Sequence, residues 1–478
     1  MIIRLKNNYL FITTLIFCFL GYFAFQAGSL VIPYYFIFVA LFLLVNLIFA
    51  HKKVFKNLIP FFKTNSAKYL GLLILWIILG IIISTFRGTF NSSGFITTFM
   101  GNFLISQFLI FFSMVIALPH IISFKQLSKI LLIVFFVIFF LGILEFIGDL
   151  FNIEFMQNIF SFLVNKKDAL TLERHVILAF GFPRISSVFQ EASYLAGFIV
   201  ISSPLVYHLC FSKIKILKKR IFDILLKRST FVFMIVCLFL TQSPIFVCLQ
   251  LTIVFIALLQ STSVLMKKKT VSFGIWIMSL LSFVILIHFA GFDIVEKINM
   301  TESSIGRIIK TISNFSSMGA LVFVEPSLAT RIGNFAAQFH VFLDNPITGV
   351  GYGNINSVWA QQVLSLPFPI TSELCGVAML LGTQKCGASM FFKFLSETGL
   401  VGTFLLFLFF GNLLYGINKN LSLYKGIEKD LIIGLKYTFI VIICTSFYDT
   451  FAYMGIQWLY IGIIQAMLLS KQNPKENK

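Results

Sequence analysis

The chain has 478 residues, of which 58% are hydrophobic and only 12% are charged, and its mean hydropathy is +0.95. Soluble globular proteins are roughly half apolar and about a quarter charged, so this composition excludes that class and indicates a polytopic membrane protein. The formal net charge of +19 comes with no RNA- or DNA-binding signature, and its placement along the chain predicts membrane topology instead.

Apolar runs of about 20 residues, long enough to cross a hydrocarbon core of about 30 Å, recur along the chain. The first run has no small-residue cleavage site and is closely followed by another, so we expect a retained helix and not a signal peptide. The sequence therefore predicts an all-α polytopic integral membrane protein with about 12 transmembrane helices. Their approximate spans are 9–27, 30–50, 68–86, 98–117, 129–149, 188–211, 229–242, 244–262, 270–290, 391–416, 431–447 and 453–470.

Basic residues concentrate at both termini and in alternate connections between the predicted helices, with about 25 of the 37 on one side of the membrane. The positive-inside rule makes that side cytoplasmic, so both termini are expected there. A medium loop at 151–187 and a large loop at 291–390 are then exported. The chain accordingly divides into helices 1–9 in residues 1–290, the large loop, and helices 10–12 with a cytoplasmic tail in residues 391–478.

The end of the medium loop has the features of an anion-binding segment. Ser187 followed by Gln190 fits a capping box, so a transmembrane helix is predicted to begin at Ser187 with its N-terminus facing outward. The free N–H groups of that terminus, with Arg184 just before it, would favour a phosphate, and Glu191 would lie in the first turn. The alternative is that Glu191 only complements the helix dipole and Arg184 only anchors at lipid headgroups; composition alone favours this alternative.

The large loop is predicted to contain an amphipathic helix. Arg331, Asn334 and Gln338 share its polar face, and His340 lies about 180° around the helix from Arg331 at 100° per residue. The apolar residues at helical spacing on the neighbouring face are Ile332, Phe335, Ala336, Phe339, Phe342 and Leu343.

A turn-forming segment follows this helix. The Asn345-Pro346 pair is predicted to end the helix, because the residue before a proline disfavours helical geometry. Gly349, Gly351 and Gly353 then permit a tight backbone that another segment can approach closely. The run lacks the Lys-Ser/Thr of a phosphate-binding loop and does not join a strand to a helix, so no nucleotide site is predicted.

Two acidic residues are predicted at or near membrane depth, where ionisable side chains are costly and rare. Glu145 lies near the outer end of the 129–149 span, and Glu397 lies where the chain re-enters the membrane after the large loop. Both are therefore candidates for function, although a place near a helix N-terminus is the simpler explanation for Glu397.

Cys375 and Cys386 are the cysteines of the predicted exported loop. In an oxidising compartment they can form a disulfide, but the sequence does not show whether their Cα atoms approach closely enough, so bonded and free forms are both open. No metal site is predicted, because the histidines are scattered and neither exported cysteine has a histidine at ligand spacing.

Three motifs follow one another on the predicted outer face. They are Arg184 with Phe-Gln-Glu-Ala-Ser-Tyr-Leu-Ala at 189–196, the Arg331 helix with Asn-Pro-Ile-Thr-Gly-Val-Gly at 345–351, and Leu-Ser-Glu-Thr-Gly-Leu-Val-Gly at 395–402. In order and topology the chain resembles the O-antigen polymerase and ligase superfamily. This resemblance implies a helical glycosyltransferase of the bacterial inner membrane that uses a lipid carrier and works on the periplasmic face.

The resemblance also implies the substrates and partners. Polymerases of the superfamily join glycan repeat units carried on undecaprenyl pyrophosphate, so donor and acceptor would both be lipid-linked, with membrane lipids and a chain-length regulator as further partners. Ligases usually carry a His-Asn pair where this chain has Ala388-Ser389, which favours the polymerase. A ligase stays an alternative, as does a flippase or transporter of lipid-linked glycans, although a transporter is expected to place charges along a central cavity.

Displacing a pyrophosphate from an anomeric carbon requires cations that stabilise the leaving group, and arginine does this with geometry as well as charge. Arg184 and Arg331 are the expected cations, so neither a metal nor a cofactor is required. Glu191 is the first candidate and Glu397 the second for the group that orients or deprotonates the acceptor hydroxyl, and His340 qualifies only if its helix is irregular. The residues expected to contact the substrates are Ser187, Gln190, Tyr194, Asn334, Gln338, Asn345, Gly349 and Gly351.

Overall fold

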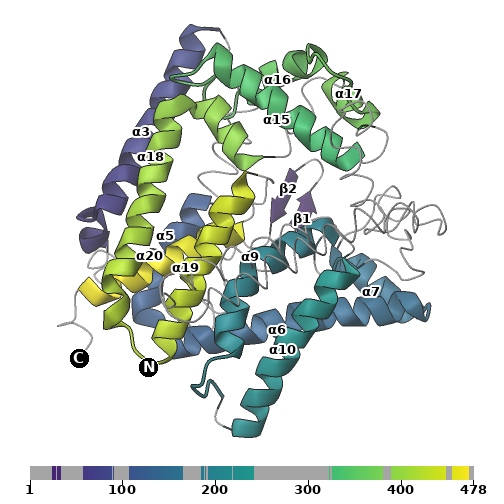
Figure 1. Cartoon of the computed structure of the whole chain (residues 1–478), viewed down its shortest axis with the longest axis vertical. Helices are drawn as coiled ribbons and strands as arrows, with labels where there is room; N and C mark the ends of the chain where they lie inside the picture. Colours follow the sequence, from purple (N-terminus) through teal and green to yellow (C-terminus); the bar gives the residue numbers. More distant parts are fainter. Residues whose placement is uncertain are drawn as a thin grey trace, which may run out of the picture.

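The computed structural model is predominantly helical in the part of the chain that it describes (Figure 1). The described residues are 24–27, 30–33, 58–88, 90, 107–164, 185–187, 189, 192–217, 219–241, 322, 326–379, 389–447 and 455–472. The helices are α3 (Asn65–Phe86), α5 (Leu109–Ile121), α6 (Phe124–Leu150), α7 (Glu154–Val164), α9 (Ala192–Cys210), α10 (Arg220–Leu240), α15 (Pro326–Asp344), α16 (Ile355–Leu364), α17 (Ser372–Met379), α18 (Met390–Asn420), the short 3-10 helix η3 (Leu421–Leu423), α19 (Ile427–Ser446) and α20 (Gly455–Gln472).

Within the described ranges, the helices α3, α6 and α18 are long and apolar enough to cross a membrane. They match the predicted spans 68–86, 129–149 and 391–416 and are consistent with a membrane protein. The twelve spans and the exported position of the large loop stay predictions. The predicted spans 244–262 and 270–290 lie outside the described residues.

Polar capping residues start the three long helices a few residues before their apolar runs. The Thr64 hydroxyl accepts the N–H of Ala67 at the start of α3, and the Ser389 hydroxyl accepts the N–H of Phe392 at the start of α18. Ser123 and Gln126 form a complete capping box on α6. Because these side chains satisfy the free N–H groups of the first turn, each helix begins earlier than hydropathy alone predicts.

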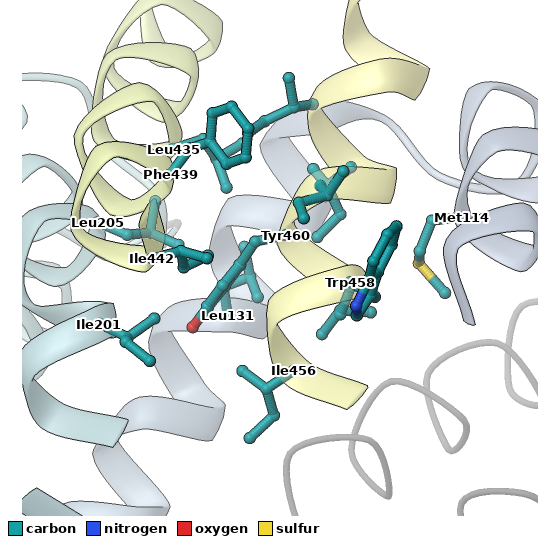
Figure 2. Packing of buried hydrophobic residues seen from close by; sticks show 14 of the residues in the cluster. Met114, Leu131, Ile201, Leu205, Leu435, Phe439, Ile442, Ile456, Trp458 and Tyr460 are labelled. Atoms are coloured by element: carbon teal, nitrogen blue, oxygen red, sulfur yellow. The ribbon is translucent and has the colours of Figure 1, made fainter. Parts of the chain in front are cut away.

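A close-packed core joins the helices α5, α6, α9, α19 and α20. Figure 2 shows side chains from several of these helices meeting around Trp458 and Tyr460 of α20. The buried Tyr460 hydroxyl lies 2.8 Å from the hydroxyl of Ser202, which satisfies it. Gly434 and Gly462 allow close helix contact, since an added Cβ would lie 3.1 Å from the Cα of Leu205 and 2.9 Å from the carbonyl oxygen of Phe111.

The chain forms a β-hairpin where two helices were expected to meet. The strands β1 (Ala24–Ala27) and β2 (Leu30–Pro33) are antiparallel and pair Ala24 with Pro33 and Ala27 with Leu30. The prediction of helix at the ends of the spans 9–27 and 30–50 is therefore wrong at these residues. A Gly-Ser pair separates the strands in the sequence, and this composition favours two-residue hairpin turns.

The helix α10 begins at Arg220, nine residues before the predicted span 229–242. Asp223 and Lys227 in its first turns are buried in a local network, in which Lys227 pairs with Asp223 at 3.0 Å and also donates to the carbonyl oxygens of Ser212 and Ile214. The network holds the 211–217 connection against the helix, so the helix extends into sequence that hydropathy reads as a loop.

The helices α15, α16 and α17 lie together at one end of the molecule, beside the end of α3 and the start of α18 (Figure 1). They come from the predicted large loop and have a small core of their own, which includes Ala337, Val341, Trp359 and Leu374. The α3 and α18 helices run side by side, and α15 packs on α18. This arrangement brings the end of the large loop against the start of α18.

Candidate functional site

The segment 345–354 docks onto α18 where that helix is broken. Gly399 has φ +67° and ψ −168°, which interrupts the helix inside α18. The carbonyl oxygens of Ser396 and Glu397, freed by the break, accept the backbone N–H groups of Val350 at 2.9 Å and Gly351 at 3.0 Å. Two segments that are distant in the sequence thereby satisfy one another's backbone groups, as buried backbone requires.

Glycines make this docking possible, as the sequence predicted. Gly349 has φ +67°, and a Cβ at this position would lie 2.3 Å from the carbonyl carbon of Glu397. A Cβ on Gly399 would lie 2.2 Å from the carbonyl oxygen of Ile347. Gly351 and Gly353 also have positive φ angles, of 91° and 89°. The close approach predicted for the glycine run is therefore confirmed.

The helix α3 closes another side of this junction. The Trp76 indole donates to the carbonyl oxygen of Thr398 at 2.9 Å, which satisfies a further carbonyl next to the break. The buried Asn354 side chain donates to the Ser84 hydroxyl at 2.9 Å and to the carbonyl oxygen of Val350 at 3.2 Å. These contacts hold α3, the 345–354 segment and α18 in one rigid cluster.

The Glu397 carboxylate lies at the centre of this cluster and is only 1% exposed. It accepts the backbone N–H groups of Gly353 and Ile355, so it caps the N-terminus of α16, where a negative charge is favoured. Its Oε1 atom has no hydrogen-bond partner among the described residues. Lys393, one turn earlier on α18 and also buried, adds a positive charge that acts on Glu397. One carboxylate oxygen is therefore fixed by backbone donors, and the other is buried without a hydrogen-bond partner among the described residues.

The helix α15 ends at Asp344, as the Asn345-Pro346 pair predicted, but its faces differ from the prediction. Asn334 and Gln338, predicted on a polar face, are buried, whereas Phe339 and Leu343 of the predicted apolar face are exposed. Phe342 of the predicted apolar face is buried, so the buried side of the helix combines residues from both predicted faces. The Ser396 hydroxyl donates to the backbone carbonyl oxygen of Gln338 at 2.7 Å, which ties this side of α15 to α18.

A second buried acid, Glu145 of α6, holds the segment that precedes α9. Its carboxylate accepts the backbone N–H of Ser186 at 2.8 Å, the hydroxyl of Ser186 at 3.1 Å and the backbone N–H of Ser187. The backbone N–H of Ile185 donates to the carbonyl oxygen of Leu240 on α10. The expectation that Glu145 is a special residue thus acquires a structural reason, since three donors surround it.

Ser187 does not cap a helix, and that prediction is wrong. The helix α9 begins at Ala192, Ser187 has φ +53°, and its hydroxyl donates to the carbonyl oxygen of Ile138 at 2.7 Å. The contacts with α6 therefore take the groups that a capping box would use. The expected site residues Arg184, Gln190 and Glu191 lie outside the described residues.

The remaining predicted residues are placed as follows. Arg331 and His340 lie half-buried on α15, and Tyr194 is half-buried in α9, against the main core. Cys375 lies in α17, and Cys386 lies outside the described residues, so the disulfide between them stays a prediction. No group of three or more His, Cys, Asp or Glu side chains in the described ranges is arranged to hold a metal ion.

The structure brings four predicted residues together at one junction, namely Asn345, Gly349, Gly351 and Glu397. Asn354, which ends the candidate segment named from the sequence, also belongs to it. Sequence reasoning missed the buried Ser84 and Lys393 and the exposed Arg87. Ser84 lies inside an apolar run, where its partner cannot be read from the sequence.

Comparison with known protein families finds no matching family model, and comparison with curated proteins finds no matching sequence. Function is therefore inferred from the chemistry of the Glu397 junction and from the motifs that meet there.

Proposed function

We propose that the chain is a membrane glycosyltransferase that polymerises oligosaccharide repeat units carried on undecaprenyl pyrophosphate. It would act at the periplasmic face of a bacterial inner membrane, with both termini in the cytoplasm and a chain-length regulator as a partner. The motif resemblance to the O-antigen polymerase and ligase superfamily supports this proposal. The observation that carries it is the junction of two of those motifs around the buried Glu397 carboxylate.

In the proposed reaction, Glu397 receives the proton of the acceptor hydroxyl. The N–H groups of Gly353 and Ile355 hold one carboxylate oxygen, while the buried Oε1 has no hydrogen-bond partner among the described residues, so the acceptor hydroxyl is proposed to donate to Oε1. The acceptor oxygen bonds to the anomeric carbon of the donor, and the bond from that carbon to the pyrophosphate oxygen breaks with its electron pair leaving on the pyrophosphate. Glu191 stays the alternative base.

The leaving pyrophosphate requires cations, and Arg331 and Arg184 are proposed for this role. Arg331 lies on α15, the helix that packs on α18 beside Glu397. The polyprenyl chains of donor and acceptor would lie along the exposed apolar side chains of the long helices, such as Leu75 on α3 and Phe404 on α18. Asn334, Gln338 and the glycine segment are proposed to contact the sugars.

Purified protein in nanodiscs tests the proposal directly. It is incubated with undecaprenyl pyrophosphate-linked repeat units and a chelator, without lipid A core, and the products are separated on a gel. The wild type should produce a ladder of polymer lengths. Glu397→Gln, which keeps the size of the side chain, should lower the rate about 100-fold or more if the carboxylate is the base. Glu428→Gln is the matched control, because Glu428 pairs with Lys471 away from the Glu397 junction, on the side proposed to be cytoplasmic.

The outcomes separate the alternatives. A folded Glu397→Gln protein that makes the ladder at the wild-type rate would show that Glu397 only caps α16. A wild type that makes no ladder but transfers glycan once core lipid is added would be a ligase. A wild type that transfers nothing, yet moves lipid-linked glycan across proteoliposomes, would be a transporter.

A further inference from the structure

Arg87 lies at the outer end of α3 and is held in one orientation by neutral oxygens. It is the C-cap residue of the helix and is exposed to solvent. Its Nη1 atom donates to the side-chain oxygen of Asn345 at 2.8 Å and to the hydroxyl of Thr348 at 3.4 Å. Both partners belong to the segment that docks onto α18. The guanidinium is thus positioned by the candidate site without being neutralised by it.

No carboxylate in the described part of the chain forms an ion pair with Arg87. By contrast, the buried Lys227 pairs with Asp223, and Lys471 pairs with Glu428. An arginine has five N–H donors in a planar fork that matches carboxylate and phosphate oxygens. The donors of Arg87 beyond Nη1 have no partner among the described residues, so an oriented cation is available for an external anion.

The surface around Arg87 is apolar and exposed. Phe86, the neighbouring residue, is 88% exposed, and Ile347, next to Thr348 in the sequence, is 63% exposed. Leu400, whose N–H donates to the carbonyl oxygen of Pro346, is 56% exposed on α18. Because α3 and α18 are long and apolar enough to cross a membrane, this surface would face lipid, and an arginine at its edge would lie at headgroup depth.

We propose that Arg87, oriented by Asn345 and Thr348, binds the phosphate group of a membrane lipid at the outer surface of the membrane. Phosphate is the anion present at this depth, and arginine binds it through paired N–H donors. The lipid is either a phospholipid, through its headgroup, or a polyprenyl pyrophosphate; the second case rests on the proposed glycosyl transfer. In that case Arg87 would hold the carrier lipid beside the junction that contains Glu397.

Native mass spectrometry of delipidated protein tests this site without any turnover. The probes are undecaprenyl pyrophosphate, phosphatidylglycerol and the neutral lipid undecaprenol. Arg87→Gln removes the charge but can still donate to Asn345, and Asn345→Asp places a competing carboxylate against the guanidinium. Both variants should lower the adduct with a phosphate-bearing probe about 10-fold or more, whereas undecaprenol adducts should not change. Lys68→Gln, the same charge change at the exposed opposite end of α3, is the control.

Each result assigns or removes the site. Loss of the undecaprenyl pyrophosphate adduct alone identifies the carrier, loss of the phosphatidylglycerol adduct alone identifies a headgroup site, and loss of both identifies a general lipid-phosphate site. Unchanged adducts in Arg87→Gln, or an equal loss of the undecaprenol adduct, would overturn the proposal. Because binding is measured without catalysis, a wild type that makes no polymer would refute the proposed function and leave this measurement valid.

Discussion

Replacement of Gly349 by alanine probes the contact between the 345–354 segment and the broken helix α18. An alanine Cβ would lie 2.3 Å from the Glu397 carbonyl carbon and 2.5 Å from the Thr398 nitrogen, where ordinary contact begins near 3.4 Å. The segment must therefore move outward by roughly 1 Å, and the backbone of an alanine at φ +67° is strained by about 1 kcal/mol.

The movement also stretches the hydrogen bonds from Val350 to Ser396 and from Gly351 to Glu397, each worth about 1 kcal/mol. Strain, overlap and lost hydrogen bonds together predict a destabilisation of about 3–5 kcal/mol. The assay is thermal unfolding of the protein in detergent, followed by size-exclusion chromatography after heating. Loss of activity in the polymerisation assay should accompany the lower melting temperature.

Gly411→Ala is the matched control on α18, because no atom lies within 4 Å of its added Cβ. Alanine inside a helix should stabilise this position by about 0.5–1 kcal/mol. The reasoning fails if Gly349→Ala melts at the same temperature as Gly411→Ala, since the close approach would then be absent from the protein.

Further substitutions test the buried charges. Glu145→Gln should lower the free energy of unfolding by about 1–3 kcal/mol, since the amide NH2 group would face a backbone N–H donor. Asp149→Asn on the same helix is the control in the melting assay. Equal shifts of the melting temperature in the two variants would contradict the contacts between Glu145 and the segment before α9. Lys227→Met should lower the free energy of unfolding by about 3–5 kcal/mol, because it leaves the buried Asp223 carboxylate without its cation. Adding Asp223→Asn to this variant should restore most of the lost stability. Burial raises the pKa of Asp223, but two backbone N–H donors and Lys227 outweigh it and hold the pKa below its usual range. The stabilisation is therefore complete above the unfolded pKa of about 3.9 and is lost as the pH falls below it, so acid melting curves should show a pH-dependent step that Asp223→Asn removes.

Short stretches of sequence predicted the elements whose formation depends on residues close together in the chain. The long apolar runs gave α3, α6 and α18, the Asn345-Pro346 pair gave the end of α15, and the glycine run gave the close backbone contact. Each of these follows from hydropathy, proline geometry or a missing Cβ, which a short window of sequence contains.

The errors arose where a partner lies far away along the chain. Ser187 fits a local capping box, but Glu145, 42 residues earlier, accepts its N–H and the α6 backbone accepts its hydroxyl. The link between Ser84 and Asn354 spans 270 residues and leaves no pattern in either segment. Periodicity on α15 predicted a buried apolar face, but the buried side combines Asn334 and Gln338 with Phe342, so hydrophobicity assigned it only in part.

The break in α18 also decides which pieces of this chain can be exchanged. A boundary drawn by hydropathy at residue 390 separates the loop from the helix, yet residues 345–354 and 396–400 supply one another's backbone partners. A chimera that imports one of these segments alone would leave carbonyl and N–H groups of the other without donors or acceptors. Chimeras of this region should therefore transplant both segments as a single module, with the α3 residues that contact them.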